Sequence, residues 1–116
     1  MLYGAQLEHE AEFLLILTTC PDEVTALELA NRLVEQGLAA CVNILPVMQS
    51  VYKWKGALQL GKEHQLLVKT RRDRYKAVEL AIQAAHPYEL PEIIAVPIVA
   101  GLPAYLAWIN DLVKKP

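Results

Sequence analysis

A chain of 116 residues with a net charge of -2 and 54% hydrophobic residues is sized for one domain that folds without disulfides. The acidic balance, with no basic stripe, argues against a nucleic-acid partner. No apolar run approaches the roughly 20 residues that a membrane-spanning helix needs, so no membrane partner is expected. Surplus apolar surface on a domain of this size is often buried between subunits.

The N-terminal residues and the two cysteines indicate a cytoplasmic protein. Cys20 and Cys41 are too far apart for a CxxC pair, which favours two reduced thiols. Residues 1–11 are polar, without a period or a secretory signal, and we expect a flexible N-terminal tail. Residues 12–116 are expected to form a single domain.

The first half of the chain predicts a strand, a helix and a second, overlong strand. The apolar run 13–19 is typical of a strand buried on both faces. Pro21 and the acids after it open a helix, which Gly37 ends as its C′ glycine. Residues 38–56 stay strand-like for about three times the usual length, with a bulge or bend at Pro46.

The second half repeats the pattern of strand, helix and strand. Two glycines in residues 56–62 predict a turn. The following elements are a strand over 63–70, a helix over 75–85 that Asp73 caps, a strand over 93–99 and a last amphipathic helix over 105–112.

This order predicts an α+β, ferredoxin-like β-α-β-β-α-β subunit with an extra C-terminal helix. The overlong strand 38–56 must bend and overhang such a domain. Its outer part carries Tyr52 and Trp54 on one face. We expect this bent hairpin arm to cover another copy of the chain.

A stiff elbow joins the second helix to the last strand. Pro87 pushes His86 out of the helical region, and Pro87 and Pro91 each fix φ and remove a backbone donor. The elbow presents a histidine, a tyrosine and two carboxylates in fixed places. This arrangement suits a binding site and equally suits a turn whose polar groups cap the backbone. The elbow is His86-Pro87-Tyr88-Glu89-Leu90-Pro91-Glu92.

Five blocks, in order over about residues 13–112, make the chain similar to the CutA-type divalent-cation-tolerance proteins. The resemblance implies a homotrimer of ferredoxin-like subunits with exchanged hairpin arms. It also implies a response to, and binding of, divalent metal ions such as copper. The blocks are Ala40-Cys41-Val42-Asn43-Ile44, Tyr52-Lys53-Trp54-Lys55-Gly56, Lys69-Thr70-Arg71, His86 through Ile93, and Tyr105-Leu106-Ala107-Trp108.

The resemblance carries over a single metal ligand, His86. In some relatives copper binding is assigned to a cysteine near the end of the first strand and to a histidine pair before the Pro-Tyr step. This chain has Thr18 at the first position and one histidine, His86, at the second. Imidazole suits Cu(II), and Glu89, Glu92 and Cys41 are the candidate helpers. No cofactor is required.

Two further functions belong to other classes. A cleft between subunits could bind a small anionic ligand, as in PII-like signalling trimers, with Lys69 and an aromatic wall. Lys69 could instead pair with Glu63 or Glu92 in an interface network. Both readings place the elbow beside Lys69 and against the hairpin of a neighbouring subunit. The candidate cleft residues are Trp54, Glu63, Lys69, Tyr88, Glu89 and Glu92.

The remaining alternative is a trimeric scaffold that anchors a protein partner. An enzyme is not expected, because the sequence offers no nucleophile with an adjacent base and orienting group.

Overall fold

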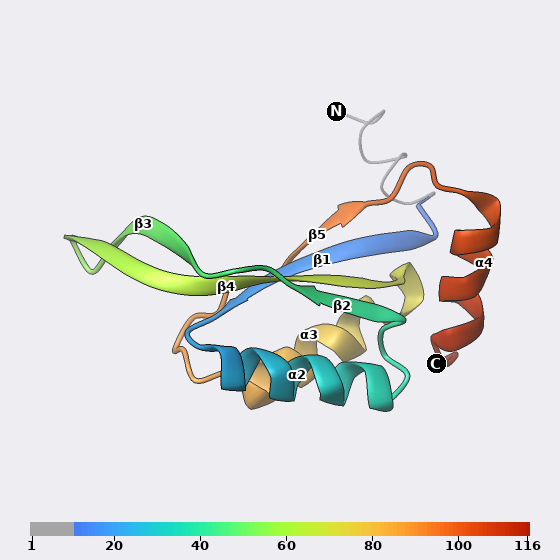
Figure 1. Ribbon diagram of the computed structural model, residues 1–116, viewed down its shortest axis with the longest axis horizontal. Coiled ribbons are helices and arrows are strands. Elements are labelled where there is room, and N and C mark those ends of the chain that lie inside the picture. Colours follow the sequence, from blue (N-terminus) through green and yellow to red (C-terminus); the bar gives the residue numbers. More distant parts are fainter. Residues whose placement is uncertain (1–10) are drawn as a thin grey trace.

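The computed structural model describes residues 11–116, so the expected tail lies outside the described residues apart from Ala11, which is buried. Figure 1 shows a sheet with helices beneath it and a hairpin projecting to one side. The elements are β1 (Phe13–Cys20), α2 (Glu23–Glu35), β2 (Cys41–Ile44), β3 (Met48–Trp54), β4 (Ala57–Arg71), η1 (Arg72–Arg74), α3 (Tyr75–Ala85), β5 (Ile94–Pro97) and α4 (Pro103–Leu112).

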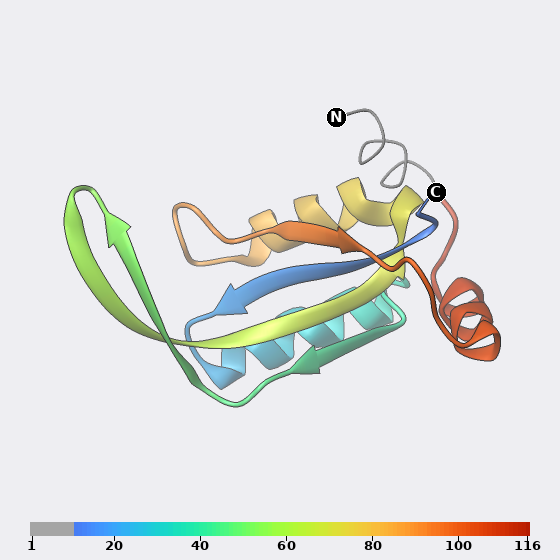
Figure 2. The same ribbon diagram turned by 90° about the horizontal axis from the view of Figure 1, so that it is seen from above.

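The strand order confirms the ferredoxin-like prediction. The sheet runs β2-β4-β1-β5, and β3 continues the pairing with β4 beyond β2. Every pair is antiparallel. Helices α2 and α3 cover one face of the sheet, and α4 stands at one end of it (Figures 1 and 2).

The core lies between the sheet and the two helices. Ile16 and Leu66 from the central strands meet Leu33 and Ile82 from α2 and α3, and all four side chains are fully buried. Burial alternates along β1, so its second face is only half-buried within one chain rather than buried as predicted. No helix among residues 11–116 is long and apolar enough to span a membrane.

Local signals in the sequence place the first helix as predicted. The Asp22 side chain accepts a hydrogen bond of 2.8 Å from the Thr25 amide, which satisfies one of the free donors of the first turn. Gly37 follows the helix with φ of 69°, a conformation that costs glycine little.

The predicted turn over 56–62 is wrong. The chain reverses in two residues, Lys55 and Gly56, with φ of 51° and 82°, as a type I′ hairpin turn requires. Strand β4 therefore begins at Ala57, and Gly61 lies inside the strand, opposite Ser50. Gly61 sits under the ring of Tyr52, where the absence of a side chain leaves room for the aromatic group.

The predicted cap of α3 is also wrong. The Asp73 carboxylate pairs with the Arg71 guanidinium and caps no helix end. A short 3-10 turn, η1, carries the chain from β4 into α3. Asp73 lies inside η1, so the residue at the N-cap position of α3 is Arg74, and the Asp73 carboxylate pairs with Arg71 instead.

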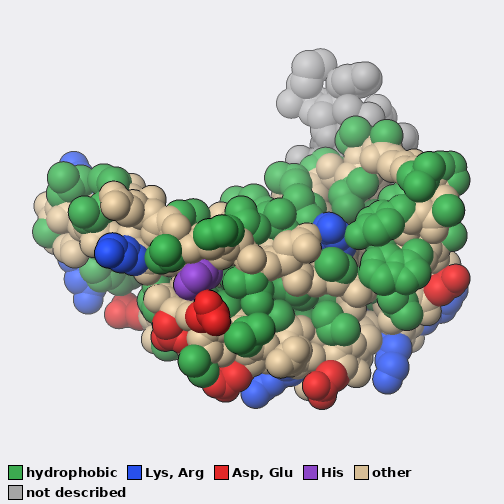
Figure 3. Space-filling model, in the orientation of Figure 1, with side chains coloured by type: hydrophobic (Ala, Val, Ile, Leu, Met, Phe, Trp, Pro, Cys, Tyr) green, Lys and Arg blue, Asp and Glu red, His purple; other side chains and the backbone are tan. Residues whose placement is uncertain are grey.

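The arm consists of β3 and the outer half of β4, and it extends past the helices (Figure 2). Cross-strand pairs put Val51, Leu58 and Leu60 on one face, where they are 67%, 75% and 67% exposed. Figure 3 shows hydrophobic side chains on the arm and around α4 on one side of the molecule. The other face of the arm carries Tyr52 and Trp54 and turns toward the elbow of the same chain.

Candidate functional site

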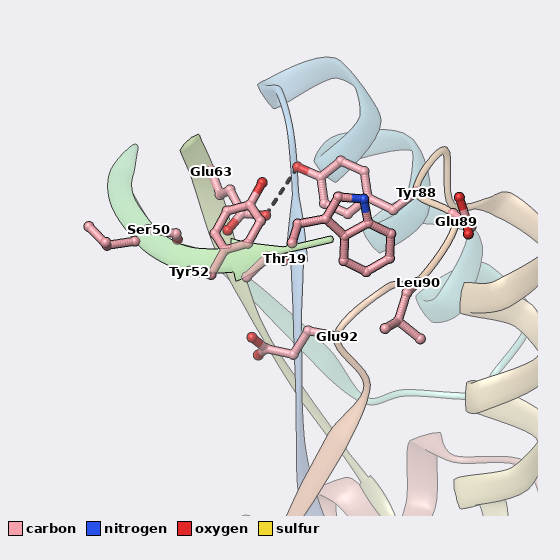
Figure 4. Close-up of a pocket in the computed structure, with 10 residues that line it drawn as sticks. Thr19, Ser50, Tyr52, Glu63, Tyr88, Glu89, Leu90 and Glu92 are labelled. Carbon is pink, nitrogen blue, oxygen red and sulfur yellow. Dashed lines mark hydrogen bonds between the residues drawn. The ribbon is translucent and has the colours of Figure 1, made fainter. Parts of the chain in front are cut away.

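A cavity of about 530 Å³ lies between the arm and the elbow. Its walls come from β1, β3, β4 and the elbow, so segments distant in sequence meet there (Figure 4). The apolar and aromatic lining residues are Val51, Tyr52, Trp54, Tyr88 and Leu90; the polar and acidic ones are Thr19, Ser50, Glu63, Glu89 and Glu92. Five of the six residues predicted for a cleft therefore gather in one place.

His86 fastens the elbow to the end of β1. Its Nε2 lies 2.6 Å from the Thr19 carbonyl oxygen, and its Nδ1 lies 3.1 Å from the Tyr88 amide nitrogen. The tautomer that carries its proton on Nε2 satisfies both bonds, with Nε2 donating and Nδ1 accepting. His86 also adopts the extended backbone that Pro87 demands.

Tyr88 joins the elbow to β4 across the cavity. Its hydroxyl donates a hydrogen bond of 3.0 Å to Oε2 of Glu63. Burial and the Glu63 carboxylate raise the pKa of Tyr88 well above its usual range. The phenol therefore stays protonated and keeps its role as a donor to Glu63.

Gln65 contacts Glu92, the last carboxylate of the elbow. Gln65 was not identified as a site residue from the sequence. Its Nε2 donates to the Thr18 carbonyl at 2.7 Å and lies 3.4 Å from Oε2 of Glu92. The available signal was an amide side chain directly before the apolar run Leu66-Leu67-Val68. Such a group is half-buried here because it can pair with both a backbone carbonyl and a carboxylate.

Glu89 stands at the rim of the cavity. Its Oε1 is 4.0 Å from Nζ of Lys55, and both side chains are more than two-thirds exposed. The same Lys55 ammonium lies 5.7 Å from the ring centre of Trp54. Exposed contacts of this kind are weak, so Lys55 occupies the rim loosely.

The cavity is acidic. Three of its ten lining residues are glutamates, and none of the ten is lysine or arginine. Lys69 lies instead near α4, where its Nζ donates to the Tyr105 hydroxyl at 3.2 Å. The prediction that Lys69 lies beside the elbow is therefore wrong for a single chain. Glu63 and Lys69 sit six positions apart on β4, and that spacing separates them by about 20 Å.

A metal centre does not form from the residues of one chain. Between residues 11 and 116, no three His, Cys, Asp or Glu side chains converge closely enough to hold an ion. Both ring nitrogens of His86 are already hydrogen-bonded. Cys41 sits opposite Lys69, away from the cavity. The role of His86 as a copper ligand stays a prediction.

The comparison with known proteins gives the family. Residues 14–112 match the family described as CutA1 divalent ion tolerance protein. This chain belongs to that family. A divalent-cation tolerance protein CutA of Thermus thermophilus is 43% identical over 96 residues, which cover 83% of this chain and 93% of that protein. The crystal structure of CutA from Xylella fastidiosa aligns with a TM-score of 0.87 at 43% identity, covering 90% of this chain and all of that one.

Some relatives in this family are considerably longer. The CutA homolog of Xenopus laevis is 44% identical over 97 residues, which cover 84% of this chain but 64% of that protein. The match to mouse CutA covers 55% of the mouse protein. The shared part is the domain described here.

Proposed function

We propose that this chain is a non-enzymatic, cytoplasmic homotrimer that works in divalent-cation tolerance by binding divalent cations, copper among them, at its acidic cavity. Membership of the CutA1 divalent ion tolerance family supports a role in divalent-cation tolerance. The acidic charge of the cavity supports it as the binding site, since its lining has three glutamates and no basic residue. Carboxylate oxygens attract divalent cations.

The open geometry predicts weak binding with little choice among metals. Glu63 and Glu92 already accept hydrogen bonds from neutral donors, and each keeps further lone pairs free. His86 can join as a ligand only if one ring nitrogen gives up its present partner, the Tyr88 amide at Nδ1 or the Thr19 carbonyl at Nε2. A metal bound at His86 would therefore move the elbow.

Calorimetric titration with Cu(II) tests this proposal. We expect Glu63→Gln and Glu92→Gln to weaken binding, because each removes a charge and keeps a hydrogen-bond acceptor. His86→Ala, with His64→Ala as the control histidine, tests whether imidazole takes part. Native affinity in both glutamate variants would place copper elsewhere and refute the acidic cavity as its site.

Trimer assembly is the second part of the proposal, and the arm supports it. The arm projects from the core with three large apolar side chains exposed on one face, a surface that an isolated chain leaves in water. Closed assembly with two further copies would bury it. Light scattering is the direct measurement, and a stable monomer at all concentrations would refute assembly.

The two alternatives have different support. The size of the cavity suits a small ligand, as a PII-like role requires, but its charge disfavours the anionic ligand expected from Lys69. A scaffold role is favoured by an exposed apolar stripe on α2, formed by Val24, Leu27 and Val34. Both stay predictions.

A further inference from the structure

We propose that the cavity between the arm and the elbow is a binding site for a small organic cation, an alkylammonium compound held between aromatic faces and the carboxylates of Glu63 and Glu92. This inference rests on the proposal above that the cavity attracts cations. It goes further by naming an organic class of ligand for the same site.

The size and spread of the cavity favour a molecule over a single ion. A volume of about 530 Å³ lies within the range of sites for small organic ligands. The three carboxylates lie on different sides of it (Figure 4), and they do not converge into a metal-holding group. An extended ligand can meet separate carboxylates that one ion cannot reach together.

The walls favour a cation with an apolar body. Tyr52, Trp54 and Tyr88 supply three aromatic rings, and aromatic faces attract ammonium groups. Tyr88 is fixed in place by its bond to Glu63 and by the His86 ring, whose centre is 4.7 Å from its own. A fixed ring loses little freedom when a ligand binds.

The chain's own ammonium group already rests at the rim. Nζ of Lys55 lies 4.0 Å from Glu89 and 5.7 Å from the Trp54 ring centre, the two kinds of contact that an alkylammonium ligand would make. Its side chain is 71% exposed and can leave this position without breaking the core. Lys55 therefore competes with a ligand for the Trp54 ring and for Glu89 at the rim.

Two carboxylates of the cavity away from Lys55 lack a cationic partner. Within residues 11–116, neither Glu63 nor Glu92 forms an ion pair. Their hydrogen-bond partners are the neutral Tyr88 hydroxyl and Gln65 amide. A bound ammonium group would supply the missing positive charge.

The test is an NMR titration of the assembled protein with benzylammonium chloride, at constant ionic strength. Benzyl alcohol is the matched probe, because it keeps the shape and lacks the charge. The chain has two indole N–H signals, one from Trp54 at the cavity and one from Trp108 on α4, which serves as an internal reference. We expect benzylammonium to move the Trp54 signal, and benzyl alcohol to bind at least about fivefold more weakly.

Three variants sharpen the test. Glu63→Gln should weaken benzylammonium binding about threefold to fivefold, since it removes a charge and keeps an acceptor for Tyr88. Lys55→Gln should strengthen binding by removing the competitor. Lys53→Gln is its control, because it changes the net charge equally from the opposite face of the same arm. Well-dispersed spectra confirm that each variant is folded.

The outcomes separate this inference from the proposed function. Equal binding of the two benzyl probes, or no Trp54 shift up to tens of millimolar probe, overturns the organic-cation site. Equal effects of the Lys55 and Lys53 variants also overturn it, because only general charge then matters. If Cu(II) binds at the cavity while benzylammonium does not, this inference falls and the divalent-cation proposal stands. If neither binds, both fall.

Discussion

The core and the arm share strand β4, but the side chains of β4 are buried in the core and exposed in the arm. In the inner half of β4, Leu66 and Val68 are fully buried against α2 and α3. In the outer half, Leu58 and Leu60 are more than 60% exposed. One continuous strand therefore passes from the hydrophobic core into a hairpin that no helix of residues 11–116 covers (Figure 1).

This difference shows that a single chain buries the apolar side chains of its core but not those of its arm. The core has helices on one face and needs no other copy to exclude water from residues such as Ile16. The arm is a two-stranded hairpin, and isolated two-stranded hairpins are marginally stable in water. Its apolar face is expected to gain stability from assembly rather than from folding.

The largest expected effect is loss of assembly when the arm is charged. In the proposed trimer, Leu60→Asp would remove a side chain whose burial is worth about 2 kcal/mol and would place a carboxylate in each contact between subunits. We expect light scattering to report monomers, while circular dichroism keeps the native helix signal.

Lys62→Gln is the matched control for the arm. It lies on the same face and makes the same change in net charge, but it removes no apolar surface. Assembly should persist in this variant. Dissociation of both variants alike would mean that charge, rather than the apolar face, governs association.

A smaller effect is expected from a cavity in the core. Leu66→Ala should lower the free energy of unfolding by about 3 kcal/mol, because the fully buried side chain leaves a void between sheet and helices. Urea unfolding at a fixed protein concentration measures this. Leu80→Ala, at a site 55% exposed on α3, is the control and should change stability little. Similar losses from both variants would contradict the assignment of the core.

The smallest expected effect is a decline of core stability in alkali through Cys20. Burial, followed by the carboxylates of Asp22 and Glu63, raises the pKa of this thiol from 9.0 to about 11. Because the folded pKa is the higher one, the contribution to stability is complete below pH 9 and is lost as the pH rises toward 11.

Urea unfolding at about pH 8 and about pH 10 measures this decline. The fall between the two values should be smaller in Cys20→Ala than in the native chain, with Cys41→Ala as the control. A fall as large in Cys20→Ala as in the native chain would assign the decline to other groups.

The sequence alone determined the local elements and the family. Apolar periodicity predicted β1 and α3, and Gly37 and Pro87 marked the ends of α2 and α3. These signals depend on neighbours within a few residues, so they survive without knowledge of the fold. Five of the six predicted cleft residues, three of them in the elbow, also proved to lie together.

Only the tertiary structure decided the register of the long hairpin and the charge of the cavity. Gly61 suggested a turn, but pairing with β3 extended β4 through it. The same register put Glu63 at the elbow and carried Lys69 to α4. The hairpin register follows from the two-residue turn at Lys55 and Gly56, which the apolar pattern did not show. The packing of the elbow and α4 against β4 joins segments far apart in the sequence, and local patterns do not contain it.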